Sequence, residues 1–205
     1  MIDALRDVLV PPRCAGCGSG GQWLCARCRE GIEPLSRRLP GLRLRAAGAY
    51  AGPLRDAIHR LKYRGERGLA HELGGLVAAQ LVRDLARGGA HDAVVPVSLH
   101  PARAKERGYD QAMLLSEVIA DAAGLPLLGA LHRVRAGAAQ VSLDRAARLR
   151  NVAGAFVARA GALAGLRVVL VDDVATTGAT LRAAAAAARA AGATAIGAYV
   201  VAVDE

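Results

Sequence analysis

The sequence predicts an α/β fold in which a mainly parallel sheet is flanked by helices. Apolar runs without a strict two-residue alternation are separated by helix-like stretches, a pattern typical of strands that are buried on both faces. The chain has 205 residues, of which 53% are hydrophobic, so it can bury a core of its own. Because sheets of this kind bind ligands beyond the carboxyl ends of their strands, functional residues are expected there.

The expected elements follow one another along the chain after residue 40. A short strand at 46–50 leads to a helix that Gly52 and Pro53 open and that Arg64 and Gly65 close. The other helices are expected at 69–86, 111–122 and 180–191, two of them ended by glycine. The remaining strands are expected at 92–99, 152–157, 166–171 and 195–203.

Residues 1–40 differ in character from the rest of the chain. They hold all four cysteines and several glycines, and they contain no long periodic segment. Such a stretch is too small to form a hydrophobic core alone. We therefore expect two units, a small cysteine module at 1–40 and an α/β domain at 41–205.

The cysteines form two CxxC pairs, CAGC and CARC, with seven residues between them. Each pair can wrap a metal ion in one tight turn, and two pairs complete a tetrahedron. This favours a structural zinc site over an iron–sulfur cluster or a redox pair. A closed set of four thiolates leaves no coordination position for catalysis. The predicted ligands are Cys14, Cys17, Cys25 and Cys28.

The charge balance points to an anionic partner. Lysine and arginine number 27 against 18 acidic residues, a net charge of +9, and only Lys62 and Lys105 are lysines. Arginine binds carboxylates and phosphates with a planar fork, so nucleic acid or a phosphorylated small molecule is the expected partner. An arginine-rich codon usage is the alternative explanation. Aromatic residues make up only 3%, which leaves few platforms on which bases could stack.

No segment has the pattern of a membrane span or a secretory signal. The first residues lack a basic region followed by a long apolar core. The richest apolar run, Ala183 to Ala188, is much too short to cross a bilayer. We expect a cytoplasmic protein with reduced cysteines.

The stretch VVLVDDVATTGATL, from Val168 to Leu181, places two carboxylates at the end of an apolar run. Small residues and a glycine then allow consecutive backbone N–H groups to point inward, and the following helix adds its N-terminal dipole. This is the chemistry of a monophosphate cradle. A strand end followed by a threonine cap is the simpler alternative. The stretch lacks the lysine of a P-loop, which argues against an NTPase.

A second group of residues follows the strand expected at 92–99. His100, Arg103, Lys105 and Arg107 crowd one predicted loop that ends at Gly108. Cations clustered at the carboxyl end of a strand suit a pyrophosphate, although a solvated basic loop is the alternative.

Together, the strand, the acidic pair and the TTGxT loop resemble the 5-phosphoribosyl-1-pyrophosphate (PRPP) signature of type I phosphoribosyltransferases. The resemblance implies that fold, with Asp172 and Asp173 as catalytic residues that bind the ribose 2′- and 3′-hydroxyls, and Mg²⁺ bound with PRPP. The loop that follows would hold the 5′-phosphate. The PRPP-binding residues carried over are Asp172, Asp173, Val174, Ala175, Thr176, Thr177, Gly178, Ala179 and Thr180.

Three further segments resemble the ComF family, which includes the GntX branch: YAGPLRDAIHRLKYRG, VVPVSLHPARAKERGYDQA and RVRAGAAQVSLDRAARLRNVAGAF. With the cysteine pairs they extend the resemblance over nearly the whole chain. Departures from the family pattern are Ser98 in place of a second proline, Tyr109-Asp110 in place of Phe-Asn, and no threonine near Gly137. The implied pyrophosphate-binding residues are Ser98, Arg103, Lys105, Arg107 and Gly108, and those of the mobile catalytic loop are Arg135, Gln140, Arg148 and Asn151.

The resemblance implies two alternative functions. The first is a protein of natural transformation that binds PRPP and single-stranded DNA, with a DNA-uptake helicase or other competence proteins as partners. The second is an active phosphoribosyltransferase that transfers ribose phosphate from PRPP to a nucleobase. No residue pattern in the sequence announces a pocket for an acceptor base.

Overall fold

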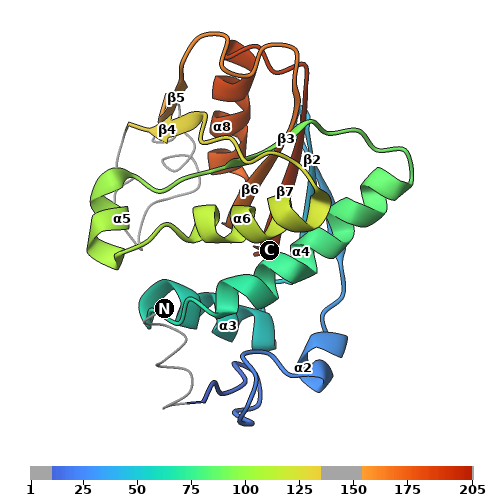
Figure 1. Ribbon diagram of the computed structural model, residues 1–205, viewed down its shortest axis with the longest axis vertical. Coiled ribbons are helices and arrows are strands. Elements are labelled where there is room, and N and C mark those ends of the chain that lie inside the picture. Colours follow the sequence, from blue (N-terminus) through green and yellow to red (C-terminus); the bar gives the residue numbers. More distant parts are fainter. Residues whose placement is uncertain (1–10, 135–153, 205) are drawn as a thin grey trace.

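The computed structural model describes residues 11–134 and 154–204, and its centre is a five-stranded sheet (Figure 1). The strand order is β1-β2-β7-β6-β3, and only the β1–β2 pair is antiparallel. The predicted mainly parallel sheet is therefore confirmed. The strands are β1 (Leu35–Leu39), β2 (Leu42–Ala49), β3 (Ala93–Pro96), β6 (Arg167–Ala175) and β7 (Ala195–Val203).

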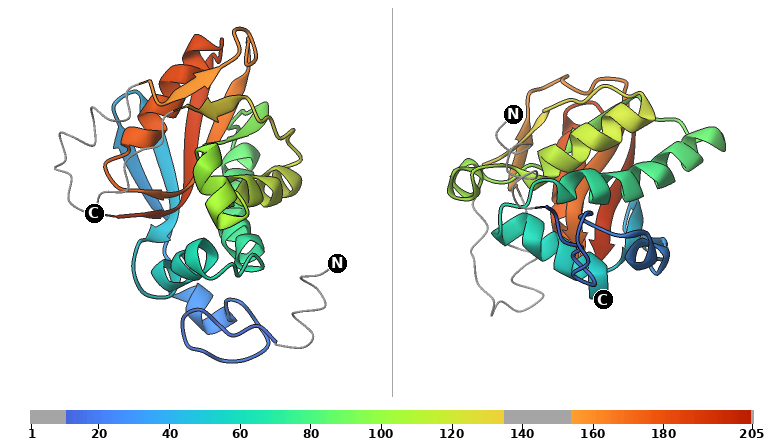
Figure 2. Two further views of the ribbon diagram at one scale, coloured as in Figure 1. Left: turned by 90° about the vertical axis from the view of Figure 1, so that its left-hand side faces the viewer. Right: turned by 60° about the horizontal axis from the view of Figure 1, so that its bottom comes forward.

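Helices cover both faces of this sheet (Figure 2). One face packs against α3 (Gly52–Tyr63), α4 (Leu69–Ala86) and α6 (Gln111–Ala123). The other packs against α8 (Ala179–Ala190) and a small antiparallel pair, β4 (Leu131–Arg133) and β5 (Phe156–Ala158). Successive residues of β6 contribute to opposite cores, as the alternation of side chains along a strand requires.

The strand expected at 152–157 is wrong in position and in partner. The structure has β5 at Phe156–Ala158, and it pairs with β4 outside the main sheet. Phe156 is buried whereas Val157 is 45% exposed, so this segment has one covered face and cannot be a central strand.

The N-terminal part of the sheet extends further than the sequence suggested. β1 lies before residue 41, and β2 begins at Leu42 rather than at 46. Burial alternates along β1, which is typical of an edge strand with one face in solvent. Because β1 contains a serine and two arginines, it does not form an apolar run in the sequence.

The cysteine module, with the short helix α2 (Ala26–Glu30), packs against α3 and α4 (Figure 1). A Cβ atom on Gly16 would lie 2.7 Å from Cys28 Sγ and 2.8 Å from Pro53 Cβ, so the first knuckle touches the start of α3. A Cβ atom on Gly68 would collide with the Trp23 indole at the start of α4. An ion pair between Arg29 of α2 and Glu72 of α4 also joins the module to the domain.

The segment after β3 is helical, not the loop that was expected. α5 spans Pro101–Arg107, with the His100 side chain capping its N-terminus and Gly108 in the left-handed conformation at its C-terminus. Proline at the first helical position and glycine just past the end are the usual helix boundaries. No helix among the described residues is long and apolar enough to cross a membrane.

Candidate functional site

The acidic pair lies within β6 and not beyond it. β7 continues to pair with β6 as far as Ala175, whereas β3 pairs only as far as Val171. From Asp172 onward, one side of β6 therefore has no neighbouring strand. The expectation that the pair follows the end of the strand is corrected, but it does lie where the sheet opens.

Asp173 points into the protein and both of its carboxylate oxygens are engaged. The residue is 5% exposed. One oxygen lies 2.9 Å from Lys62 Nζ, and the other accepts a hydrogen bond of 2.8 Å from Gln111 Nε2. Burying a carboxylate is costly unless it is paired and hydrogen-bonded, and Asp173 meets both conditions.

Asp172 is in a different environment. Its side chain is partly exposed, and one oxygen accepts a hydrogen bond of 2.8 Å from the backbone N–H of Asp173. Burial and the charge of Asp173 raise the pKa of Asp172 to about 8, although Lys62 and Arg133 oppose the shift. A carboxylate in this state gains from any ligand that donates hydrogen bonds to it or adds positive charge.

Lys62 comes from the last turn of α3, which follows β2 at the carboxyl edge of the sheet. Its side chain is 18% exposed. Burial opposes its charge, but the nearby Asp173 outweighs burial, so the pKa of Lys62 is raised. Gln111 also accepts a hydrogen bond of 2.5 Å from Arg107. These four side chains connect α3, α5, α6 and β6 in one polar network.

The predicted phosphate loop, Thr176 to Thr180, connects β6 to α8. Gly178 caps α8 with φ +70°, a conformation that favours glycine, and a Cβ atom there would collide with Leu39 of β1. The Thr177 hydroxyl accepts a hydrogen bond from the N–H of Ala179 at 3.4 Å. Glycine at this position is thus required by its backbone conformation and by the close approach of β1.

Two arginines that the sequence did not single out as ligand-binding lie near this loop and the acidic pair. Arg37 of β1 donates a hydrogen bond of 3.2 Å to the carbonyl of Thr176. Arg133 of β4 acts electrostatically on Asp172, and its Nε is buried without a hydrogen-bond partner. Burial lowers the pKa of Arg133 despite the opposing charge of Asp172. Arg37 could not be assigned from the sequence because it reaches the site from a distant strand, whereas Arg133 begins the stretch that resembles the mobile catalytic loop.

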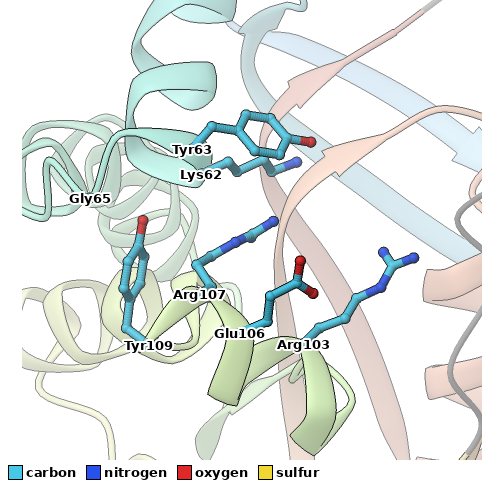
Figure 3. A pocket seen from close by; sticks show the side chains of 7 residues that line it. All are labelled: Lys62, Tyr63, Gly65, Arg103, Glu106, Arg107 and Tyr109. Carbon is cyan, nitrogen blue, oxygen red and sulfur yellow. The ribbon is translucent and has the colours of Figure 1, made fainter.

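The basic residues of α5 separate into two groups. Arg103 and Arg107 line a cavity of about 450 Å³ between the end of α3 and α5, whereas Lys105 is exposed and does not line it (Figure 3). Ser98 precedes α5, and the carbonyl of Gly108 accepts a hydrogen bond from Arg67. The other side chains that line the cavity are Lys62, Tyr63, Glu106 and Tyr109.

Asp110, which departs from the family pattern, has a structural role. It caps α6 by accepting hydrogen bonds from the N–H groups of Ala112 and Met113. Its other oxygen accepts one of 2.9 Å from the N–H of Leu99. An aspartate serves as an N-cap as well as asparagine does. The other four predicted site residues, Arg135, Gln140, Arg148 and Asn151, lie outside the described residues.

The four cysteines form a cluster whose geometry fits a metal ion. Their sulfur atoms all lie within 4.8 Å of one another, and those of Cys17 and Cys25 are 3.6 Å apart. Zinc–sulfur bonds of about 2.3 Å in a tetrahedron place sulfurs about 3.8 Å apart. The backbone N–H of Cys25 points at Cys14 Sγ at 3.4 Å. The donor set is therefore a candidate metal site.

The pKa values of these thiols also indicate that a bound cation would be favourable at the cluster. Hydrogen bonds involving Ser19 lower the pKa of Cys17 to about 6. Desolvation and then the neighbouring thiols raise the pKa of Cys28 to about 12. Four adjacent thiolates repel one another, and a divalent cation at their centre would remove that cost.

Comparison with known proteins places these features in context. The phosphoribosyl transferase domain family matches residues 118–205. The chain is 31% identical to the DNA utilization protein YhgH of Salmonella typhimurium, covering 86% of this chain and 76% of that one. It is 32% identical to competence protein F of Haemophilus influenzae, covering 83% and 75%. Competence protein ComFC of Streptococcus pneumoniae is 29% identical, covering 75% and 61%.

Among solved structures, the glutamine PRPP amidotransferase of B. subtilis complexed with ADP and GMP is similar with a TM-score of 0.43 and 25% identity. The match covers 64% of this chain and 25% of that one. The phosphoribosyltransferase fold predicted from the acidic pair and its loop is confirmed by the family match together with the mainly parallel, helix-covered sheet.

Proposed function

Because the chain belongs to the ComF family of phosphoribosyltransferase-like proteins, we propose that the carboxyl edge of its sheet binds PRPP. The observation that supports this most is that a partly exposed carboxylate, Asp172, lies at the end of β6, just before the Gly178 loop that starts α8. Ribose hydroxyls donate to Asp172, and the 5′-phosphate accepts from the backbone N–H groups and threonine hydroxyls of Thr176 to Thr180.

In this proposal the two acids have different roles. Asp172 binds the ribose, whereas Asp173 holds Lys62 and Gln111 and thereby fixes the floor of the site. The pyrophosphate lies toward Arg103 and Arg107 of α5. Mg²⁺ bound with PRPP would supply positive charge, which would favour the ionised form of Asp172.

The biological role that we propose is in DNA uptake during natural transformation, in the cytoplasm. It is supported by the family, whose relatives are named for competence and DNA utilization. The net charge of +9 fits contact with single-stranded DNA, and a DNA-uptake helicase or other competence proteins would be the protein partners. Transfer of ribose phosphate to a base is the second candidate, because a lined cavity lies beside the acidic pair.

Calorimetric titration of the purified chain tests the PRPP proposal directly. We expect heat of binding for PRPP with Mg²⁺, and weaker heat for ribose 5-phosphate or pyrophosphate alone, because each fills only part of the site. Replacing Mg²⁺ with chelator should weaken PRPP binding. The absence of any heat of binding for PRPP with Mg²⁺ at concentrations up to the millimolar range would contradict the proposal.

We also propose that the cysteine cluster holds one structural Zn²⁺ through Cys14, Cys17, Cys25 and Cys28. The module has few buried apolar side chains of its own and depends on contacts with α3 and α4. Four thiolates close the coordination sphere, so the ion would hold the module's fold and take no part in chemistry at the PRPP site.

Metal removal should be visible at Trp23, the single tryptophan of the chain. Its indole packs against Gly68, and the Arg60 guanidinium lies 6.0 Å from its ring centroid. We expect one equivalent of zinc in the purified protein, and a red shift and loss of Trp23 emission when a chelator removes it. Readdition of Zn²⁺ should reverse both. Iron and visible absorbance would indicate a cluster instead, and zinc far below one equivalent with unchanged emission would contradict the proposal.

A further inference from the structure

Two adjoining cavities run along α4, and no residue that lines them belongs to the proposed PRPP site. The larger, of about 490 Å³, lies between α4, β2 and the chain that joins α2 to β1, which passes beside α4 (Figure 1). The smaller, of about 260 Å³, lies between the end of α4 and the β1–β2 pair. Because Pro34 and Arg83 line both, we treat the two cavities as one feature and call it the α4 groove.

The larger cavity is mainly apolar. Ile32, Ala47 and Leu76 contribute buried or half-buried side chains to its lining. Two of its charged residues, Arg29 and Glu72, form an ion pair with each other. An apolar side chain that entered here would therefore lose contact with water without displacing an unpaired charge of that pair. The other lining residues are Glu30, Pro34, His71, Gly75, Ala79 and Arg83.

Gly75 keeps this cavity open at a cost in helix stability. At the preceding Gly74, a Cβ atom would lie 2.8 Å from Val118 Cβ of α6, so the contact between the two helices requires glycine. At Gly75, a Cβ atom would meet no described heavy atom within 4 Å beyond its chain neighbours and its own helix. Glycine inside a helix is less stable than alanine, and packing offers no reason for it at this position. A larger side chain here would fill the groove.

The smaller cavity is basic. Arg83 and Arg87 lie one turn apart at the end of α4, and both are exposed. No ion pair among the described residues includes either of them. Asp84 also lines the cavity, but its carboxylate lies 3.0 Å from Arg45 Nε and accepts a hydrogen bond of 2.7 Å from the Tyr199 hydroxyl. Like charges at this spacing repel each other, so an anionic group between the two arginines would be favourable.

We propose that the α4 groove binds a short acidic peptide segment of a partner protein. An apolar side chain of the segment occupies the larger cavity, and its carboxylates meet Arg83 and Arg87, whose planar forks suit carboxylates. From Gly75 to Arg87 the helix rises about 18 Å. This is the length of about five extended residues, which sets the size of the segment.

The charge and the shape of the groove favour this occupant over two others. A second copy of the chain also carries a net charge of +9 and would be repelled by the basic end. The phosphates of a nucleic acid would fit the basic end but would leave the apolar cavity unused. An acidic segment with an apolar residue matches both ends.

Fluorescence anisotropy with a labelled probe peptide, Leu-Ser-Asp-Glu-Asp-Glu, tests the proposal on the full chain. We expect saturable binding below millimolar concentration. A probe with serine in place of leucine should bind about 10-fold more weakly, because the larger cavity stays empty. A probe with lysine in place of every acid should not bind. No binding of the acidic probe up to 1 mM, roughly the limit of specific recognition, would overturn the proposal.

Gly75→Leu tests the larger cavity. It should weaken the acidic probe about 10-fold, because the new side chain occupies the space that the probe's leucine needs. Gly75→Ala is the matched control and should bind as the wild type does. Both variants should unfold at the same or a higher urea concentration than the wild type, since each replaces a helical glycine. Loss of binding in Gly75→Leu would then not be a loss of folding.

Arg83→Gln with Arg87→Gln tests the smaller cavity. The double variant should bind the acidic probe about 10-fold more weakly, and its binding should depend less on salt. Arg55→Gln with Arg64→Gln removes the same two charges from exposed positions on α3 and at its end, away from the groove. This control should retain the wild-type affinity. Probe binding that neither Gly75→Leu nor the Arg83 and Arg87 pair changes would place the peptide elsewhere and overturn the proposal.

Three further measurements separate the other outcomes. Self-association in sedimentation that Gly75→Leu abolishes, without probe binding, would assign the groove to a second copy and overturn the proposal. An oligothymidine that binds through Arg83 and Arg87, displaces the probe and ignores Gly75→Leu would assign the basic end to nucleic acid, with the same consequence. PRPP is titrated into the same variants. PRPP heat without probe binding contradicts only this proposal, and probe binding without PRPP heat contradicts only the PRPP site.

Discussion

Asp172→Asn is expected to make the protein more stable and to make it a poor binder of PRPP. The carboxyl of Asp172 has a pKa of about 8 in the folded protein, against an ordinary value of 3.8, because of burial and the charge of Asp173. The unfolded chain therefore loses this proton near pH 4, whereas the folded chain keeps it until near pH 8. The stability of the wild type falls as pH rises through that window.

Asparagine cannot ionise, and its side-chain oxygen can still accept the hydrogen bond from the N–H of Asp173. The variant should match the wild type below pH 4 and exceed it by roughly 2 kcal/mol at pH 8, which is less than the full pKa difference implies because solvent screens the partly exposed Asp172. Urea unfolding at pH 4, 6 and 8 measures this difference. Asp121→Asn, at an exposed position of α6, removes the same charge and should show no such trend.

PRPP affinity should change in the opposite direction. Charge-assisted hydrogen bonds from the ribose hydroxyls are lost, which corresponds to about 10- to 100-fold weaker binding at pH 8. In the wild type, affinity should rise with pH toward 8, because the ligand selects the ionised carboxylate. Wild-type PRPP affinity in a variant with unchanged stability would show that Asp172 neither carries strain nor binds the ligand.

The sequence predicted best what depends on local pattern. The apolar run at 195–203 became β7 with the expected bounds, and helices 69–86 and 111–122 agree to within a residue. The loop that we propose binds phosphate could be predicted because its glycine and threonines closely follow the two acids in the sequence. The helix α5 was missed because its clustered cations were interpreted as a pyrophosphate-binding loop, although Pro101 and Gly108 mark its ends.

What the sequence could not supply is contact between distant segments. Lys62 belongs to a helix that starts after β2, and only the parallel pairing of β2, β7 and β6 brings the end of that helix to Asp173. From the sequence alone, the two neighbouring aspartates appeared equivalent. Their different environments arise from the alternation of a strand, which turns Asp173 toward α3 and α6 and leaves Asp172 partly exposed.

Lys62→Met should be among the most destabilising single changes at this site. It leaves Asp173 buried with only Gln111 as a side-chain partner. Removing one partner of a buried ion pair costs about 3 kcal/mol or more. Arg55→Met in the same helix is the control, since its pair with Asp56 is exposed, and it should change stability by less than about 0.5 kcal/mol.

The double variant Lys62→Met with Asp173→Asn separates a structural acid from a ligand-binding one. Neutral side chains of similar size can replace a buried ion pair at little cost, so we expect the double variant to regain most of the lost stability. The coupling energy between the two substitutions should be about 2 kcal/mol. Equilibrium unfolding of the four proteins in the cycle gives this number.

The same four proteins decide how the acidic pair divides its work. If Asp173 serves mainly to hold Lys62 and Gln111, the double variant, once stable, should bind PRPP within about 10-fold of the wild type, because Asp172 and the Gly178 loop are intact. If Asp173 also contacts the ribose, the double variant should fail as Asp172→Asn does despite its restored stability. Since both Asp173 oxygens already have protein partners at 2.9 and 2.8 Å, a ribose contact would require one of them to be displaced, and we expect the first result.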